Sequence, residues 1–146
     1  MVNKSPKKLY STADWRIIVK EGVYKRRNWF ICSVGTHPCA YVRMTKKEMV
    51  YDWEGMPIDV HGGITFSELK PELSMTESTK ILDKHPLIGW DYAHGGDLYY
   101  KRIEDLENKS LHAYTLNEIK KDVYSVIDQL ETLKKNNYRM PENDTI

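Results

Sequence analysis

The sequence has little cysteine, little phenylalanine and no long apolar run. Two cysteines among 146 residues are too few for a secreted scaffold held by disulfides. No stretch approaches the roughly 18 apolar residues of a membrane span, and residues 1–20 lack the apolar region of a signal peptide. We therefore expect a soluble, cytoplasmic protein that does not enter membranes, with Cys32 and Cys39 as buried free thiols.

The sequence also lacks an excess of charge of either sign. The 22 basic and 21 acidic residues leave a formal net charge of +1. General binding to nucleic acid needs a basic face, so this balance argues against it. Two short basic runs, at residues 4–8 and 25–27, are interpreted as a solvated tail and a solvated turn.

The residues that are abundant indicate one globular domain. Hydrophobic residues make up 40% and charged residues 29%, which is typical of a folded chain. Ten Tyr and four Trp suit half-buried positions, grooves and interfaces. We expect a single α+β domain over residues 10–135, between a flexible basic N-terminus (1–9) and a flexible tail (136–146).

Short apolar runs bounded by charged residues, glycine or proline predict the strands. These runs cover residues 15–20 (with Gly22 as an interruption), 28–34, 39–44 and 87–92. The second and third runs flank His37-Pro38 and are expected to form a hairpin. Residues 58–68 alternate like a strand with a bulge at Gly62-Gly63. A capping box at Thr45 and Glu48 predicts a short helix that ends by Gly55.

The last helix has the clearest pattern. Thr115 is a good N-cap and Glu118 completes a capping box. An apolar stripe at helical spacing follows, formed by Ile119, Val123, Val126, Ile127, Leu130 and Leu133. The fold class that we predict is therefore α+β, with a small, mainly antiparallel sheet packed against a C-terminal amphipathic helix.

Two His-Gly-Gly triplets, beginning at His61 and His94, hold half of the eight glycines. Glycine pairs mark unusual backbone angles or a close approach of the backbone to another group. On an extended strand, Asp59 and His61 would face the same side. Asp91, His94 and Asp97 are spaced by three, which would gather them around a tight turn.

Imidazoles and carboxylates in this pattern suit three kinds of chemistry. They can bind a divalent metal, act as general acid and base, or complement an anion nest made by the glycine N–H groups. The opposing interpretation is structural: the glycines make turns and each histidine bonds a nearby carbonyl or carboxylate. The sequence identifies neither a metal nor a cofactor.

The two segments together resemble a family of small uncharacterised proteins from bacteriophages and bacteria. Residues 59–66, Asp-Val-His-Gly-Gly-Ile-Thr-Phe, are similar to the first family pattern, HGG(I/L)T(F/Y). Residues 89–97, Gly-Trp-Asp-Tyr-Ala-His-Gly-Gly-Asp, are similar to the second, G(F/W)DxAHxGD, with Trp90 where Phe is commoner. The likeness covers residues 37–97, carries no established activity, and implies a phage or prophage origin.

From these residues we expect a phage-type accessory protein in the host cytoplasm, with a His/Asp pocket that binds a small polar or phosphate-bearing ligand. Whether it also hydrolyses that ligand stays open. The candidates for catalysis are His61, His94, Asp91 and Asp97, and those for ligand binding are Asp59, Gly62, Gly63, Thr65, Gly95 and Gly96. The alternative is a non-enzymatic, anti-defence inhibitor that blocks a host protein through a Tyr/Trp-rich surface.

Overall fold

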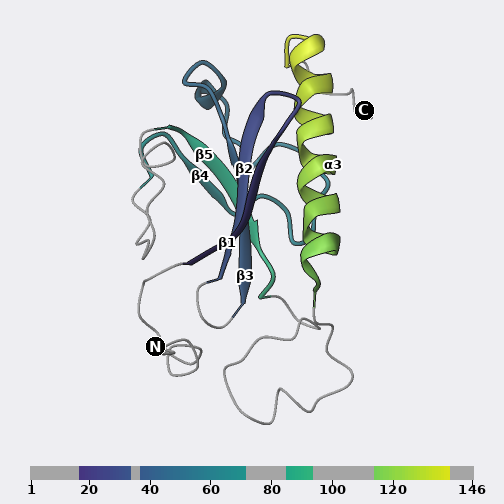
Figure 1. Ribbon diagram of the computed structural model, residues 1–146. Coiled ribbons are helices and arrows are strands. Elements are labelled where there is room, and N and C mark those ends of the chain that lie inside the picture. Colours follow the sequence, from purple (N-terminus) through teal and green to yellow (C-terminus); the bar gives the residue numbers. More distant parts are fainter. Residues whose placement is uncertain (1–16, 34–36, 72–84, 94–113, 139–146) are drawn as a thin grey trace, which may run out of the picture.

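The computed structural model describes residues 17–33, 37–71, 85–93 and 114–138. Within these ranges the elements are β1 (Ile17–Tyr24), β2 (Arg27–Ser33), β3 (Pro38–Arg43), the 3₁₀ turn η1 (Glu48–Val50), β4 (Phe66–Glu68), β5 (Leu87–Asp91) and α3 (Leu116–Lys135). The strands form an antiparallel sheet in the order β1-β2-β3-β5-β4, with α3 beside it (Figure 1). This arrangement confirms the predicted α+β fold. The expected basic N-terminus lies outside the described residues.

Successive strand residues point to opposite faces of the sheet, and the sequence fills the two faces differently. In β2, Trp29 and Ile31 join the main core under α3, whereas Phe30 and Cys32 belong to a smaller cluster on the other face. The same alternation runs through β3 and β5. At the end of β5, the adjacent residues Asp91 and Tyr92 therefore lie on opposite sides of the sheet.

The helix α3 begins and packs as its sequence predicts. The Thr115 hydroxyl accepts a hydrogen bond from the Glu118 N–H at 3.1 Å, and the Glu118 carboxylate accepts one from the Thr115 N–H at 2.8 Å. All six residues of the apolar stripe are buried, which confirms its role in the core. In the described part of the chain, no helix has the length and apolar character needed to cross a membrane.

The strand predictions for residues 28–34, 39–44 and 87–92 are confirmed to within one or two residues, and β2 and β3 pair as the expected hairpin. The prediction of an interruption at Gly22 is wrong, because β1 continues through it. The Trp29 ring lies against Gly22 so closely that a Cβ there would come within 2.9 Å of Trp29 Cζ2. Glycine is thus used at this position to make room for the indole.

Two local predictions are only partly right. Residues 58–65 are not a strand, and of the predicted segment only β4 is extended. The capping box at Thr45 and Glu48 forms, with bonds of 3.2 and 2.9 Å. The helix is nevertheless limited to η1, because Tyr51 already adopts an extended conformation.

A buried ion pair joins the β1–β2 hairpin to η1 and α3. Arg27 is 7% exposed and Glu48 is 3% exposed. The Arg27 Nη1 and Nη2 atoms donate to both Glu48 oxygens at 2.9 and 2.6 Å, and Arg27 Nε donates to Glu131 at 3.0 Å. The Tyr138 hydroxyl, in the segment expected to be a tail, also donates to Glu48. The interpretation of residues 25–27 as a solvated turn is therefore wrong for Arg27.

The turn before Arg27 has an unusual backbone for its residues. Lys25 and Arg26 have φ angles of 48° and 70°. Tyr24 pairs with Arg27, so the two residues form a two-residue hairpin loop with positive φ at both positions, as in a type I′ turn. Such turns favour Asn and Gly, and each larger residue in this conformation costs roughly 1 kcal/mol or more.

The packing of α3 gives a stability prediction with an internal control. Leu130 is fully buried, whereas Leu116 on the same helix is 42% exposed. We expect Leu130→Ala to lower the free energy of unfolding by about 2–5 kcal/mol, because it leaves a cavity in the core. Leu116→Ala should change it by only about 0.5 kcal/mol. Urea denaturation measures both, and equal effects of the two variants would contradict the described packing.

The Arg27–Glu48 pair predicts acid sensitivity. Burial raises the pKa of Glu48, but the hydrogen bonds from Arg27 and Tyr138 outweigh it and lower the pKa to about 2 from an ordinary value of 4.5. A carboxylate with a lowered pKa contributes stability above its ordinary pKa, here about 3 kcal/mol, and loses it as the pH falls towards the folded value. Below about pH 4.5, wild-type stability should therefore approach that of Glu48→Gln.

Urea denaturation of both proteins at steps between about pH 6 and about pH 2 measures this difference. Glu54→Gln is the matched control, because Glu54 is exposed. A difference between wild type and Glu48→Gln that stays constant over this range would show that the ion pair is not the source of the acid sensitivity.

Candidate functional site

The first His-Gly-Gly segment forms a tight turn. The Gly63 N–H donates to the Val60 carbonyl at 2.8 Å, and Gly62, the third residue of the turn, has a φ of 73°. A positive φ at this position is typical of a type II turn and favours glycine. The turn places His61 at its corner. The expectation that Asp59 and His61 share one face of a strand is therefore wrong.

Both ends of this turn are fastened to the fold. The backbone N–H and carbonyl of Asp59 both bond the side-chain amide of Gln129 on α3, at 2.8 and 2.9 Å. The Thr65 N–H donates to the carbonyl of Gly89 in β5 at 3.0 Å. Asp59 and Thr65 are themselves exposed. Through their backbone hydrogen bonds they hold the turn between the helix and the sheet.

The His61 ring belongs to an aromatic triad with Tyr92 and Tyr114. It lies nearly parallel to the Tyr92 ring, with centroids 5.1 Å apart and an interplanar angle of 6°. Tyr114 closes the triad, with centroids 4.9 Å from His61 and 4.8 Å from Tyr92. The Tyr114 hydroxyl lies 3.3 Å from His61 Nδ1. His61 is half-buried, so its ring is both held in place and partly accessible.

Tyr92 is the fixed member of the triad. Its hydroxyl accepts from Trp90 Nε1 at 2.9 Å and donates to Asp122 of α3 at 2.6 Å. Burial, and then the hydrogen bond to Asp122, raise the pKa of Tyr92 well above its usual value. The hydroxyl therefore stays protonated at neutral pH. A histidine held on this platform can exchange protons, and its ring can stack with a flat ligand.

Asp91, which the sequence grouped with the histidines, lies apart from the triad. It is the cross-strand partner of Cys39, on the face of the sheet away from α3. One of its carboxylate oxygens accepts from the Ala93 N–H at 3.2 Å. The other residues of the second segment, His94, Gly95, Gly96 and Asp97, lie outside the described residues. Their place in the site stays a prediction.

The two cysteines are buried and free, as predicted. They face each other across β2 and β3. A hydrogen bond with Cys32 lowers the pKa of Cys39, burial opposes this, and His37 adds a further lowering, so that the pKa of Cys39 is about 6. This pairing of thiols with an imidazole is a chemical feature that the strand-like sequence around them did not indicate.

Sequence reasoning missed the partners of His61. Tyr92 lies within the second segment but was not given a role, and Tyr114 and Asp122 are single polar residues near the start of α3 without a recognisable pattern. Only the packing of α3 and of the His61 turn against the end of β5 brings them together. In the described residues, no group of three or more His, Cys, Asp or Glu is placed to hold a metal ion.

The tryptophans expected on an interaction surface are largely internal. Trp29, Trp53 and Trp90 are all at most 3% exposed. Each fills the main core between the sheet and α3. Among the described residues, the expected Tyr/Trp-rich surface would therefore have to be formed by tyrosine.

Comparison with known proteins gives no further assignment. No family model, curated protein or solved structure matches the chain. The likeness of its two motifs to phage proteins is therefore a sequence expectation, and the function has to be inferred from the site.

The hydrogen bonds of Tyr92 generate a prediction. Tyr92→Phe keeps the ring on which His61 lies but removes the acceptor of the buried Trp90 N–H and the donor to Asp122. We expect a loss of about 1–3 kcal/mol in the free energy of unfolding, because a buried donor is left without its partner. Tyr114→Phe, in a half-buried residue, is the control and should cost less. A Tyr92→Phe protein as stable as wild type in urea would contradict this network.

Proposed function

We propose that this protein binds a small polar or phosphate-bearing ligand in a pocket formed by its two His-Gly-Gly segments. The observation that carries the proposal is the stacking of His61 on Tyr92. Tyr92 precedes His94 by only two residues, and two residues of extended chain span at most about 7 Å. The residues that directly precede the second segment thus lie beside the first segment, and this contact supports a pocket that both segments share.

Within this pocket we assign His61 and His94 as the acid–base or ligand-binding pair. Asp97 is the carboxylate that we place beside them, because Asp91 lies on the opposite face of the sheet. The turn at Gly62 and Gly63 brings backbone close to the ligand, since neither residue carries a side chain. Tyr114 orients the His61 ring through its contact with Nδ1.

The same pair of imidazoles suits hydrolysis of a phosphate ester. One histidine removes a proton from water, whose oxygen forms a bond to phosphorus. The ester P–O bond breaks, and the other histidine gives its proton to the departing alcohol oxygen. The likeness of the motifs to phage proteins supports an accessory role in the cytoplasm of an infected host.

The test uses p-nitrophenyl phosphate with the full chain. In NMR titrations, the probe should shift the ring protons of His61 and His94 together. If the protein is hydrolytic, His61→Gln and His94→Gln should each reduce p-nitrophenolate release by about 10²–10⁴-fold. The double variant should lose much less than the product of the single losses, because residues that act as a unit are not additive.

His85→Gln is the matched control, because His85 lies in a separate turn before β5. It should leave both the shifts and any turnover unchanged. Thermal melts of all variants should stay close to wild type. Absence of ring-proton shifts at His61 and His94 would contradict the proposal, whether or not the variants fold.

A further inference from the structure

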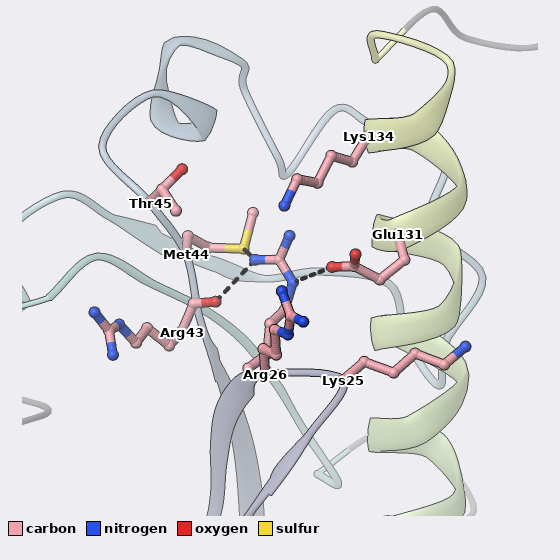
Figure 2. A pocket seen from close by; sticks show the side chains of 8 residues that line it. Lys25, Arg26, Arg43, Met44, Thr45, Glu131 and Lys134 are labelled. Carbon is pink, nitrogen blue, oxygen red and sulfur yellow. Dashed lines mark hydrogen bonds and ion pairs between the residues drawn. The ribbon is translucent and has the colours of Figure 1, made fainter.

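A cavity lies at the end of α3 far from the aromatic triad, between the β1–β2 turn, the end of β3 and the last turns of the helix. Its volume is about 520 Å³, within the range of small-molecule sites. The lining residues are Lys25, Arg26, Arg27, Arg43, Met44, Thr45, Glu131 and Lys134. In Figure 2 the Lys134 side chain points from α3 into this cavity, towards Met44. Below we call this cavity the basic pocket.

The basic pocket carries an excess of positive charge. Five of its lining side chains are cationic, and one, Glu131, is anionic. Two further carboxylates outside the lining pair with these cations: Glu48 with Arg27, and Asp128 with Lys25 at 2.6 Å. Five cations against three carboxylates leave two positive charges uncompensated. Arg27 pairs with both Glu48 and Glu131, so within the described residues Arg26, Arg43 and Lys134 make no ion pair.

The fold holds Arg27 in place and presents Arg26 at the mouth of a tight turn. Arg27 is fixed by Glu48, by Glu131 and by the carbonyl of Arg43, to which its Nη1 donates at 3.1 Å. Arg26 is presented by a turn whose positive φ would suit Asn or Gly better. Backbone strain of this kind is concentrated at functional sites. A solvated turn without a ligand would gain stability from the smaller residues.

We propose that the basic pocket binds the phosphate group of a small phosphate monoester. A monoester phosphate carries about −1.5 to −2 charges near neutral pH, which matches the net excess of two positive charges. Planar guanidinium groups and an ammonium group suit phosphate oxygens. Thr45 adds a hydroxyl group at the rim.

The basic pocket is separate from the aromatic triad around His61. Asp122, which holds Tyr92, and Lys134 are twelve residues apart on α3, which corresponds to about 18 Å along the helix. The proposal therefore does not rest on the function assigned to the histidines. Substitutions in one pocket should leave the other unaffected.

Two probes of similar shape and different charge test whether the basic pocket recognises a dianion. Phenyl phosphate becomes a dianion above its second pKa of about 6, whereas phenyl sulfate stays a monoanion. In NMR titrations of the full chain, phenyl phosphate should shift the backbone amides of residues 25–27, 43–45 and 131–134 saturably. Its affinity should rise from about pH 5 to about pH 7.5, and that of phenyl sulfate should stay low.

Variants then locate the binding. Lys134→Gln and Arg26→Asn should each weaken phenyl phosphate binding about tenfold, because each removes a charge-assisted hydrogen bond. Arg26→Asn should also leave the melting temperature unchanged or raise it, since Asn tolerates this turn. Lys121→Gln removes the same charge from an exposed position of α3 and should leave the affinity unchanged. His61→Gln should also have no effect on these shifts.

Three results would overturn the proposal. Phenyl phosphate and phenyl sulfate binding with equal affinity would exclude recognition of a dianion. An equal loss of affinity for phenyl phosphate in Lys121→Gln and Lys134→Gln would show that the effect comes from the overall charge of the protein. Tighter binding of a phosphodiester oligonucleotide than of phenyl phosphate, weakened by the same variants, would identify a nucleic-acid surface instead.

Discussion

The buried ion pair between Arg27 and Glu48 fixes one whole end of this structure. It lies where the β1–β2 hairpin, η1 and the end of α3 meet, and it also receives the hydroxyl of Tyr138. Breaking such a pair by removing one partner leaves a charge without compensation in the interior, which is far more costly than losing a surface contact. Because Arg27 bonds both oxygens of Glu48, the same contact fixes the position of η1 and the position of Arg27 in the basic pocket.

The alternation of side chains across the sheet decides which functional groups meet. Tyr92 lies on the α3 side and receives His61, whereas its neighbour Asp91 lies on the opposite side with Cys39. One helix therefore contributes to two distant regions: Asp122 fixes the aromatic triad near its start, and Glu131 and Lys134 line the basic pocket near its end. The length of α3 between Asp122 and Lys134 keeps these two regions apart.

Much of the fold follows from local patterns in the sequence. The capping box at Thr115 and the apolar stripe after it predict α3, and the buried apolar runs predict β2, β3 and β5. The site was harder to predict, because it depends on register and on turns. The glycines after His61 convert an alternating segment into a turn. Only the packing of this turn against β5 shows that His61 meets Tyr92. Similarly, the charge run at residues 25–27 does not reveal that Arg27 turns inward to Glu48, since that partner is 21 residues away.

The central claim is that the two His-Gly-Gly segments form one site on the α3 side of the sheet. The most direct measurement is a set of nuclear Overhauser effects among the ring protons of the full chain in solution. Effects between His61 and Tyr92 are expected from their stacked rings and serve as the internal reference. We expect further effects that connect His61 with His94. If the His61–Tyr92 effects are present but His94 contacts only residues on the Cys39 face, the two segments do not share a pocket and the account is contradicted.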